Sequence, residues 1–168
     1  ISVKIRLLEN KNDTLDLISR LLKSGISNLT VHCRTQLMRN RETPITDYLD
    51  EIIEKCRQNN VSCIVNGKLN GKMDYLKLQE KYGNDVGAMI AEAAESNPSV
   101  FKETPEDWQS VFKDFVTLST KYDNWLGNSK YCLLKIVPGK LQIYNQIQKA
   151  KTNQQLQDIV SQLDGLST

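Results

Sequence analysis

The sequence lacks a long apolar run, has almost no net charge and contains one histidine, and each of these features limits the functional classes to which the protein can belong. It contains no run of about 18 apolar residues, so no segment is predicted to span a membrane. The formal net charge is only +2, which neither requires nor excludes a nucleic-acid partner, because clustering of lysine and arginine on one face matters more than the total. It has a single histidine, His32, and a lone histidine is by itself weak evidence for a site.

Cysteine is sparse and scattered. The four cysteines are Cys33, Cys56, Cys63 and Cys132, and no two of them form a CxxC pair. This spacing argues against a zinc site and against a disulfide framework. Reduced thiols in a cytoplasmic, or also nuclear, setting are the interpretation we adopt.

The first hundred residues repeat a strand and a helix. Apolar strands are predicted to start near residues 2, 29, 61 and 86, with helical periodicity between them, and a helix start is predicted at Thr43-Pro44. A period of about thirty residues is typical of a (β/α) barrel or of a doubly wound sheet. The chain opens inside a strand pattern without an initiator methionine, which suggests a piece of a longer protein.

The pattern changes after Asn97-Pro98. Residues 104–107 (TPED) are predicted to start a helix, and further helices are expected at 128–137, 140–150 and 152–164. The sequence therefore predicts two domains, residues 1–100 and an all-helical bundle of residues 101–168. Basic and aromatic positions of this bundle suit a nucleic-acid surface, and a solvated helix face explains them equally well. They are Lys113, Lys121, Lys130, Tyr131 and Lys135.

Polar or small residues follow each predicted strand. His32 ends the second strand, residues 66–68 (NGK) follow the third, and residues 91–93 (AEA) follow the fourth. Lys4 and Arg6 share one side of the first strand, the barrel interior, where buried cations need an anion, an electron-rich ring or a salt bridge. In a barrel the carboxyl ends of the strands carry the function. Together these positions describe a pocket for a phosphate-bearing cofactor.

Six motifs follow one another along the chain: residues 3–7 (VKIRL), 31–35 (VHCRT), 65–67 (VNG), 89–94 (MIAEAA), 97–98 (NP) and 128–133 (NSKYCL). In this order they resemble the motifs of the tRNA-dihydrouridine synthases. The last motif resembles the helical domain of the eukaryotic type that acts at position twenty of the D-loop. The resemblance covers nearly the whole chain. It implies the second half of a TIM-type (β/α)8 barrel followed by a helical bundle.

The resemblance also implies an enzyme and its ligands. It implies an FMN-dependent oxidoreductase that uses NADPH to reduce the C5–C6 bond of a tRNA uridine, with the flavin carrying the redox chemistry and the base flipped out. The implied cofactor-binding residues are Lys4, His32, Asn66, Gly67, Ala91 and Glu92. The implied RNA-binding residues are Arg6, Arg34, Arg39, Arg41, Lys113, Lys130 and Tyr131. No metal site is expected.

Two departures from the family pattern stand out. Glu92 occupies a position where the family has an arginine that pairs with phosphate, which leaves backbone donors and the histidine to compensate. The family's catalytic cysteine belongs to a motif of the first half of the barrel, and that motif does not occur here. Cys33 lies on the right face by sequence but stands where the family commonly has glycine, so we do not assign it as the catalyst.

We therefore expect half of an enzyme, whose partner is the N-terminal half of its own barrel. The chain alone is expected to be inactive and to bind FMN poorly, because four βα units cannot close an eight-stranded barrel. The alternatives are a noncatalytic tRNA-binding module, another flavin oxidoreductase on the same barrel, and a structural helical adaptor. The adaptor would leave Lys4, His32 and Asn66 scattered instead of converging.

Overall fold

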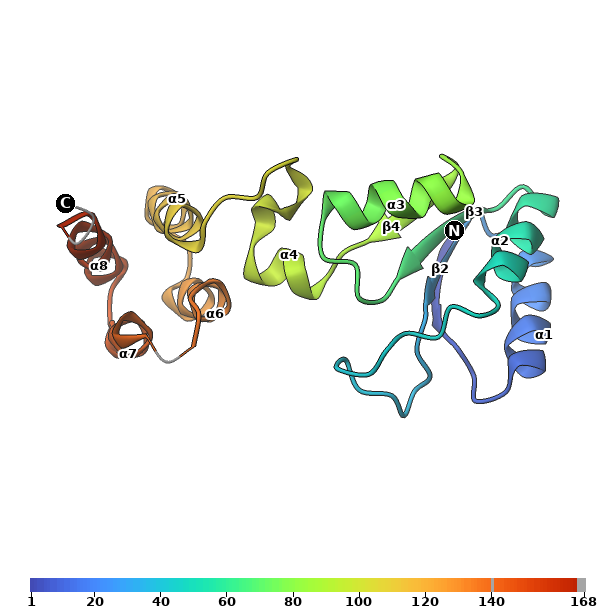
Figure 1. The fold of residues 1–168 in the computed structure, drawn as a ribbon. Helices are drawn as coiled ribbons and strands as arrows, with labels where there is room; N and C mark the ends of the chain where they lie inside the picture. Colours follow the sequence, from blue (N-terminus) through green and yellow to red (C-terminus); the bar gives the residue numbers. More distant parts are fainter. Residues whose placement is uncertain (140, 166–168) are drawn as a thin grey trace. The chain divides into compact units, whose positions relative to one another are not determined.

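A computed structural model describes residues 1–139 and 141–165, and it divides the chain into two compact units. We call residues 1–91 the sheet unit and the residues from 92 onward the helical unit (Figure 1). Within the described residues, no helix combines the length and the apolar character that crossing a bilayer requires. Each unit is described by itself below.

The sheet unit alternates strands and helices, as the sequence predicts. Its elements are β1 (Ser2–Arg6), α1 (Lys11–Leu22), β2 (Asn28–His32), α2 (Leu49–Gln58), β3 (Ser62–Asn66), α3 (Lys72–Tyr82) and β4 (Val86–Met89). The four strands are parallel and lie in the order β1-β2-β3-β4. Sequential parallel neighbours joined by helices are the arrangement of repeated βαβ units.

One face of this sheet is apolar and covered by helices. Leu29, Val31 and Val65 point to that face and belong to one buried cluster with Ile18 of α1 and Ile53 of α2. The other face alternates with it and carries Lys4, Arg6 and His32 among other residues. Because successive strand residues point to opposite sides, burying the first set necessarily presents the second set on the opposite face.

Lys4 and Arg6 are exposed in this structure, which corrects the expectation that they are buried cations. They are exposed because α1, α2 and α3 all pack on the opposite face of the sheet, where they contribute to the buried cluster. On this face the side chains of Lys4 and Arg6 are exposed, whereas Thr30 and Asn66 are buried.

Helix starts differ from the predicted ones where long-range bonds intervene. The predicted start at Thr43-Pro44 is wrong, because α2 begins only at Leu49. The backbone N–H of Ile45 donates to the carbonyl of Cys33 at 2.8 Å, which holds this segment against the end of β2. Helix α3 begins at Lys72, after a turn in which Gly67 and Lys68 have positive φ values that a helix does not contain.

The helical unit contains five α-helices and one 3-10 helix among its described residues. They are α4 (Glu92–Ser96), η1 (Pro98–Phe101), α5 (Trp108–Lys121), α6 (Leu126–Ile136), α7 (Gln142–Lys149) and α8 (Asn153–Gly165). Its core includes Phe112, Val116, Leu133, Ile147 and Leu156, each fully buried. The three later helices lie within two residues of the predicted ranges, and residue 140 of one prediction falls outside the described residues.

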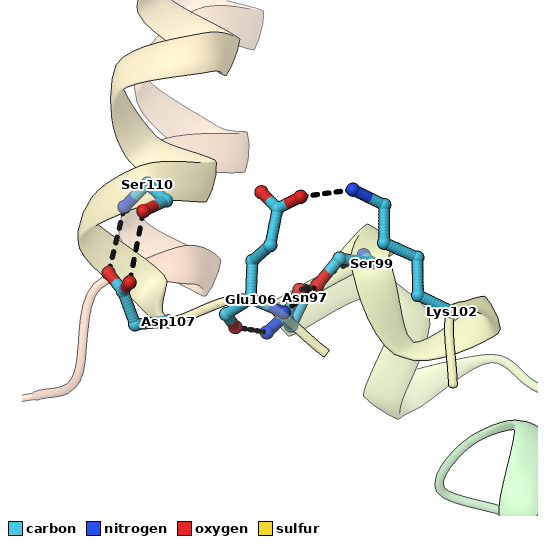
Figure 2. Close-up of polar contacts among 6 residues, drawn as sticks. All are labelled: Asn97, Ser99, Lys102, Glu106, Asp107 and Ser110. Carbon is cyan, nitrogen blue, oxygen red and sulfur yellow. Dashed lines mark hydrogen bonds and ion pairs between the residues drawn. The ribbon is translucent and has the colours of Figure 1, made fainter. Parts of the chain in front are cut away.

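The segment between η1 and α5 is held by polar contacts (Figure 2). The Asn97 carboxamide oxygen accepts from the Ser99 N–H at 3.0 Å and hydroxyl at 2.6 Å, and its nitrogen donates to the Glu106 carbonyl at 2.8 Å. The Glu106 N–H donates to the Ser99 hydroxyl at 2.8 Å. These bonds tie residues 97–106 together. The structure divides the chain into its two units after Ala91, whereas the sequence suggested a domain boundary at residue 100.

Helix α5 is capped by Asp107, not by Thr104. The Asp107 carboxylate accepts from the Ser110 N–H and from the Ser110 hydroxyl, each at 2.9 Å (Figure 2). A carboxylate at this position satisfies an unpaired backbone donor and interacts favourably with the helix dipole. Helix α5 therefore begins directly after the predicted start segment 104–107, and the last residue of that segment is the cap.

Candidate functional site: polar residues at the strand ends

The strand register brings four predicted site residues together on the open face of the sheet. Arg6, His32, Asn66 and Met89 are paired across the four strands, and Lys4 lies one pleat earlier in line with Thr30. In a parallel sheet the residues of one row point to the same side. This row consists of the last residue of each strand, at the carboxyl ends. Lys4, Arg6, His32 and Asn66 therefore converge, unlike the scattered arrangement of a purely structural adaptor.

Asn66 joins three strands through its backbone and side chain. It is only 8% exposed, and its carboxamide nitrogen donates to the Met89 carbonyl at 2.8 Å. Its own carbonyl accepts from the Cys33 N–H at 2.9 Å. Through these two hydrogen bonds, Asn66 holds the ends of β2, β3 and β4 together. The bonds also fix the starts of the loops that follow these strands.

The turn after Asn66 needs glycine. Gly67 has φ +132°, a conformation that residues with a side chain rarely adopt, and Lys68 follows at φ +54°. A Cβ at Gly67 would lie 3.6 Å from His32 Cδ2 and 3.6 Å from the Cys33 Cβ. The backbone therefore passes close to the histidine ring, in a turn whose successive positive φ values suit an anion-binding loop.

His32 is held in its neutral form. Burial and, after it, charge repulsion from Arg6, Lys4 and Arg34 together lower the pKa of the imidazole from 6.5 to about 4. Arg34 Nη1 lies 3.3 Å from His32 Nε2. At neutral pH the ring is uncharged and can offer one donor and one acceptor.

Arg34 is buried and organises the segment between β2 and α2. Its side chain is 4% exposed, and it donates from Nε to the Glu42 carbonyl at 3.0 Å and from Nη2 to the Asn40 carbonyl at 2.8 Å. This corrects the expectation of an RNA contact, because the guanidinium faces into the protein and its donors have partners there. The sequence alone does not distinguish the buried arginine from the exposed ones, because all three lie in one short loop with similar neighbours along the chain.

The other predicted RNA-binding residues of the sheet unit are exposed. Arg6 is one of them, although its Nη1 also donates to the Thr35 carbonyl at 2.9 Å. Arg39 and Arg41 lie on the loop that Arg34 organises, and both are exposed. These two arginines are the cations of this loop that are presented to solvent.

In the helical unit, two of the predicted RNA-binding residues make internal contacts. Lys130 Nζ donates to the carbonyls of Gln148 at 2.6 Å and Ala150 at 2.8 Å, so it caps the end of α7. The Tyr131 hydroxyl donates to Glu95 at 2.7 Å, although its ring is 55% exposed. Lys113 is partly buried.

Two predicted cofactor-binding residues lie where the chain passes between the units. Ala91 is the last residue of the sheet unit, and Glu92 is the first residue of α4 in the helical unit. Both are exposed. The sheet unit by itself therefore supplies every residue of the predicted set except Glu92. These residues are Lys4, His32, Asn66, Gly67 and Ala91.

Cys33 lies on the opposite face from the site, which corrects its placement from the sequence. Its side chain is 1% exposed and belongs to the apolar cluster under the helices. Burial raises the pKa of its thiol to about 11. A protonated, enclosed thiol has no access to a ligand on the polar face.

Sequence reasoning missed two residues in the same rows. Thr30, 4% exposed, lies beside Lys4, and Met89 lies beside Asn66. The two-residue period of a strand could have found Thr30, since it precedes His32 by two positions. Within residues 1–139 and 141–165, no three His, Cys, Asp or Glu side chains gather in a way that would hold a metal ion.

Comparison with known proteins decides the family. The family described as "Dihydrouridine synthase (Dus)" matches residues 1–167. The chain belongs to the dihydrouridine synthase family. The tRNA-dihydrouridine(20) synthase [NAD(P)+] of Saccharomyces cerevisiae is 45% identical over 98% of this chain and 45% of its own length.

Two further relatives agree. The protein of the same name from Schizosaccharomyces pombe is 45% identical over 93% of the chain and 33% of its own length. The tRNA-dihydrouridine(20a/20b) synthase [NAD(P)+] of Saccharomyces cerevisiae is 33% identical over 60% of the chain and 27% of its own length. The chain therefore spans less than half the length of these synthases.

Proposed function

We propose that this chain is the flavin-facing half-barrel and helical domain of an enzyme that reduces a D-loop uridine of tRNA to dihydrouridine with NADPH. The observation that carries the proposal is the row of Arg6, His32 and Asn66 at the strand ends, followed by the positive-φ turn at Gly67. Relatives that are 45% identical over nearly the whole chain are named tRNA-dihydrouridine(20) synthases. Their names also print NAD(P)+, which supports a nicotinamide reductant.

The residues of the sheet unit fit FMN. A flavin phosphate needs backbone donors, and the positive-φ turn at Gly67 would supply them. Asn66 and Gly67 would hold the phosphate end together with the backbone at Ala91 and Glu92, and Lys4 and His32 would face the ring. When bound and reduced by NADPH, the flavin would supply the hydride that saturates the C5–C6 bond.

Glu92 is the least favourable member of this set. A carboxylate near a phosphate raises the free energy of the bound state by charge repulsion. It is tolerable at the first position of α4 because an acid there interacts well with the helix dipole. Phosphate binding in this protein would therefore depend on backbone donors more than on this side chain.

The proposed partner of the sheet unit is a second set of four strands. The sheet has helices on one face and an exposed polar face on the other, which is the arrangement of half a (β/α)8 barrel. The catalytic cysteine would come from that other half, since Cys33 is buried on the wrong face. The chain alone is therefore expected to be inactive and to bind FMN weakly.

The proposed contact with tRNA uses the exposed arginines of the loop after β2. Arg39 and Arg41 are presented to solvent there, on the loop that follows the strand carrying His32. Contacts of arginine with phosphate release counterions, so affinity should fall as salt rises. The four cysteines are free, in keeping with a reducing cytoplasmic or nuclear compartment.

The experiment uses the full-length protein that contains this chain. It is given NADPH, FMN and unmodified tRNA, and dihydrouridine is read position by position for the wild type, His32→Ala and the surface control Arg20→Ala. We expect product at one D-loop position, much reduced in His32→Ala and unchanged in Arg20→Ala, whose guanidinium pairs with Asp16 on the surface of α1.

Other outcomes select the alternatives. Salt-dependent tRNA binding without product would favour the noncatalytic tRNA-binding module. NADPH oxidation that does not depend on tRNA would favour a flavin oxidoreductase of another substrate class. For the chain alone, a tight and stoichiometric FMN titration by flavin fluorescence would contradict the half-barrel proposal.

A further inference from the structure

The geometry points to Arg34 as a positioning residue that fixes His32 in the tautomer with its proton on Nδ1. Arg34 donates from Nε to the Glu42 carbonyl at 3.0 Å and from Nη2 to the Asn40 carbonyl at 2.8 Å. These two bonds fix the plane of the guanidinium, and its remaining terminal nitrogen, Nη1, lies 3.3 Å from His32 Nε2.

A guanidinium can only donate. It stays protonated at every accessible pH and has no lone pair to accept a hydrogen bond. The contact with Nε2 is therefore a hydrogen bond only if Nε2 accepts, which means that Nε2 carries no proton. In a neutral imidazole the proton then resides on Nδ1.

The surroundings of the ring favour the same state. The positive charges that act on His32 are Lys4 and Arg6 on β1 and Arg34 after β2, and each disfavours a second proton on the ring. On the Cδ2 edge, next to Nε2, the backbone of Gly67 passes close, since a Cβ there would lie 3.6 Å from Cδ2. One edge of the ring is thus held by Arg34 and Gly67.

The consequence concerns the opposite nitrogen. With Nε2 engaged, the ring presents an N–H donor at Nδ1 and no free base, so His32 would bind an acceptor oxygen or nitrogen and would not abstract a proton. The tautomer follows from the contacts of Arg34 alone. Only its use toward a bound ring or base rests on the proposed function.

The chain has a single histidine, which makes the test direct. With 15N-labelled histidine, magic-angle spinning NMR reads the protonation of both ring nitrogens in the 168-residue chain without needing a monodisperse solution. We expect Nδ1 protonated and Nε2 unprotonated at neutral pH. A spectrum with the proton on Nε2 would overturn the inference, whatever the result of the dihydrouridine assay.

Two variants separate the hydrogen bond from simple charge. Arg34→Met removes the donor, and we expect a mixture of tautomers with only a small rise in the pKa of His32, because burial, Arg6 and Lys4 lower that pKa more than Arg34 does. Arg6→Met removes a neighbouring charge and should raise the pKa while the proton stays on Nδ1. An unchanged tautomer in Arg34→Met would contradict the assignment.

A measurement on the wild type guards against misfolding of the Arg34 variant, because Arg34 also holds the Asn40 and Glu42 carbonyls. With arginine and histidine both 15N-labelled, an N–H···N bond transmits a scalar coupling between Arg34 Nη1 and His32 Nε2. Observation of this coupling supports the inference. Its absence in a spectrum that resolves both nitrogens contradicts it.

Discussion

The two units differ in where their charge and their chemistry lie. All six arginines and the only histidine occur within residues 6–57 of the sheet unit, whereas residues 92–168 contain eight lysines, no arginine and nine acidic residues. The sheet unit buries one face and presents the other as a polar row, and the helical unit buries an apolar core around Phe112. The histidine and all arginines therefore lie in the sheet unit, whereas the cations of the helical unit are lysines.

The units also carry separate natural probes. Both tryptophans, Trp108 and Trp125, belong to the helical unit, and His32 belongs to the sheet unit. Each buried cluster is formed within one unit. Tryptophan fluorescence should consequently report changes in the helical unit, and the NMR resonance of His32 should report changes in the sheet unit.

The largest effect is expected from Phe112→Ala. Phe112 is fully buried and packs edge-on against Trp108 with ring centroids 6.4 Å apart, so its loss should lower the free energy of unfolding of the helical unit by about 3–5 kcal/mol. Urea unfolding followed by tryptophan fluorescence measures this. The control Leu118→Ala, at a side chain that is 53% exposed, should stay within about 0.5 kcal/mol. A displaced His32 resonance in Phe112→Ala would show that the units are not separate.

The next effect belongs to the sheet unit. Gly67→Ala places a side chain at φ +132°, so we expect a loss of about 1–3 kcal/mol from backbone strain, measured by hydrogen exchange of β2 amides. Gly25→Ala is the matched control, because φ is +82° there and a Cβ would meet nothing within 4 Å. Both variants should lose stability, but only Gly67→Ala should shift the His32 resonance. Equal shifts in both would contradict the close approach of this turn to the ring.

A smaller effect is the pH dependence that His32 confers on the sheet unit. Its pKa is lowered to about 4 from 6.5, so between these values the unfolded chain binds more protons than the folded one. Stability should therefore be complete above pH 6.5 and fall as the pH drops toward 4. His32→Gln should flatten this dependence in hydrogen exchange of β2. A wild-type profile that is already flat between those pH values would argue against the lowered pKa.

The smallest effect should appear in the helical unit at Asp107. Hydrogen bonds from the Ser110 backbone and side chain lower the pKa of this carboxyl below its usual 3.8. The cap therefore stabilises α5 fully above that value and is lost as the pH falls through the lowered pKa. Asp107→Asn keeps an acceptor and should reduce this acid sensitivity in tryptophan-detected unfolding, whereas Asp107→Ala should destabilise at neutral pH as well. The same acid profile in wild type and Asp107→Asn would count against the cap.

Much of the sheet unit could be predicted because its signals are local. The strands at β1 to β4 appear as apolar runs, and the helices between them have a helical period. His32 and Asn66 could be placed at strand ends for the same reason, and parallel pairing then puts them in one row. The family resemblance rests on these same motifs, and the family match confirms it.

The sequence by itself thus determined the order of strands and helices, the position of the polar residues at the strand ends and the family. Only the tertiary structure decided that Arg34 is buried, that Cys33 faces the helices and that α2 begins at Leu49. The physical reason is the range of the interactions. Periodicity acts over a few residues, whereas the bonds from Ile45 to Cys33 and from Arg34 to the Asn40 carbonyl exist only once the loop has folded back on the strand end.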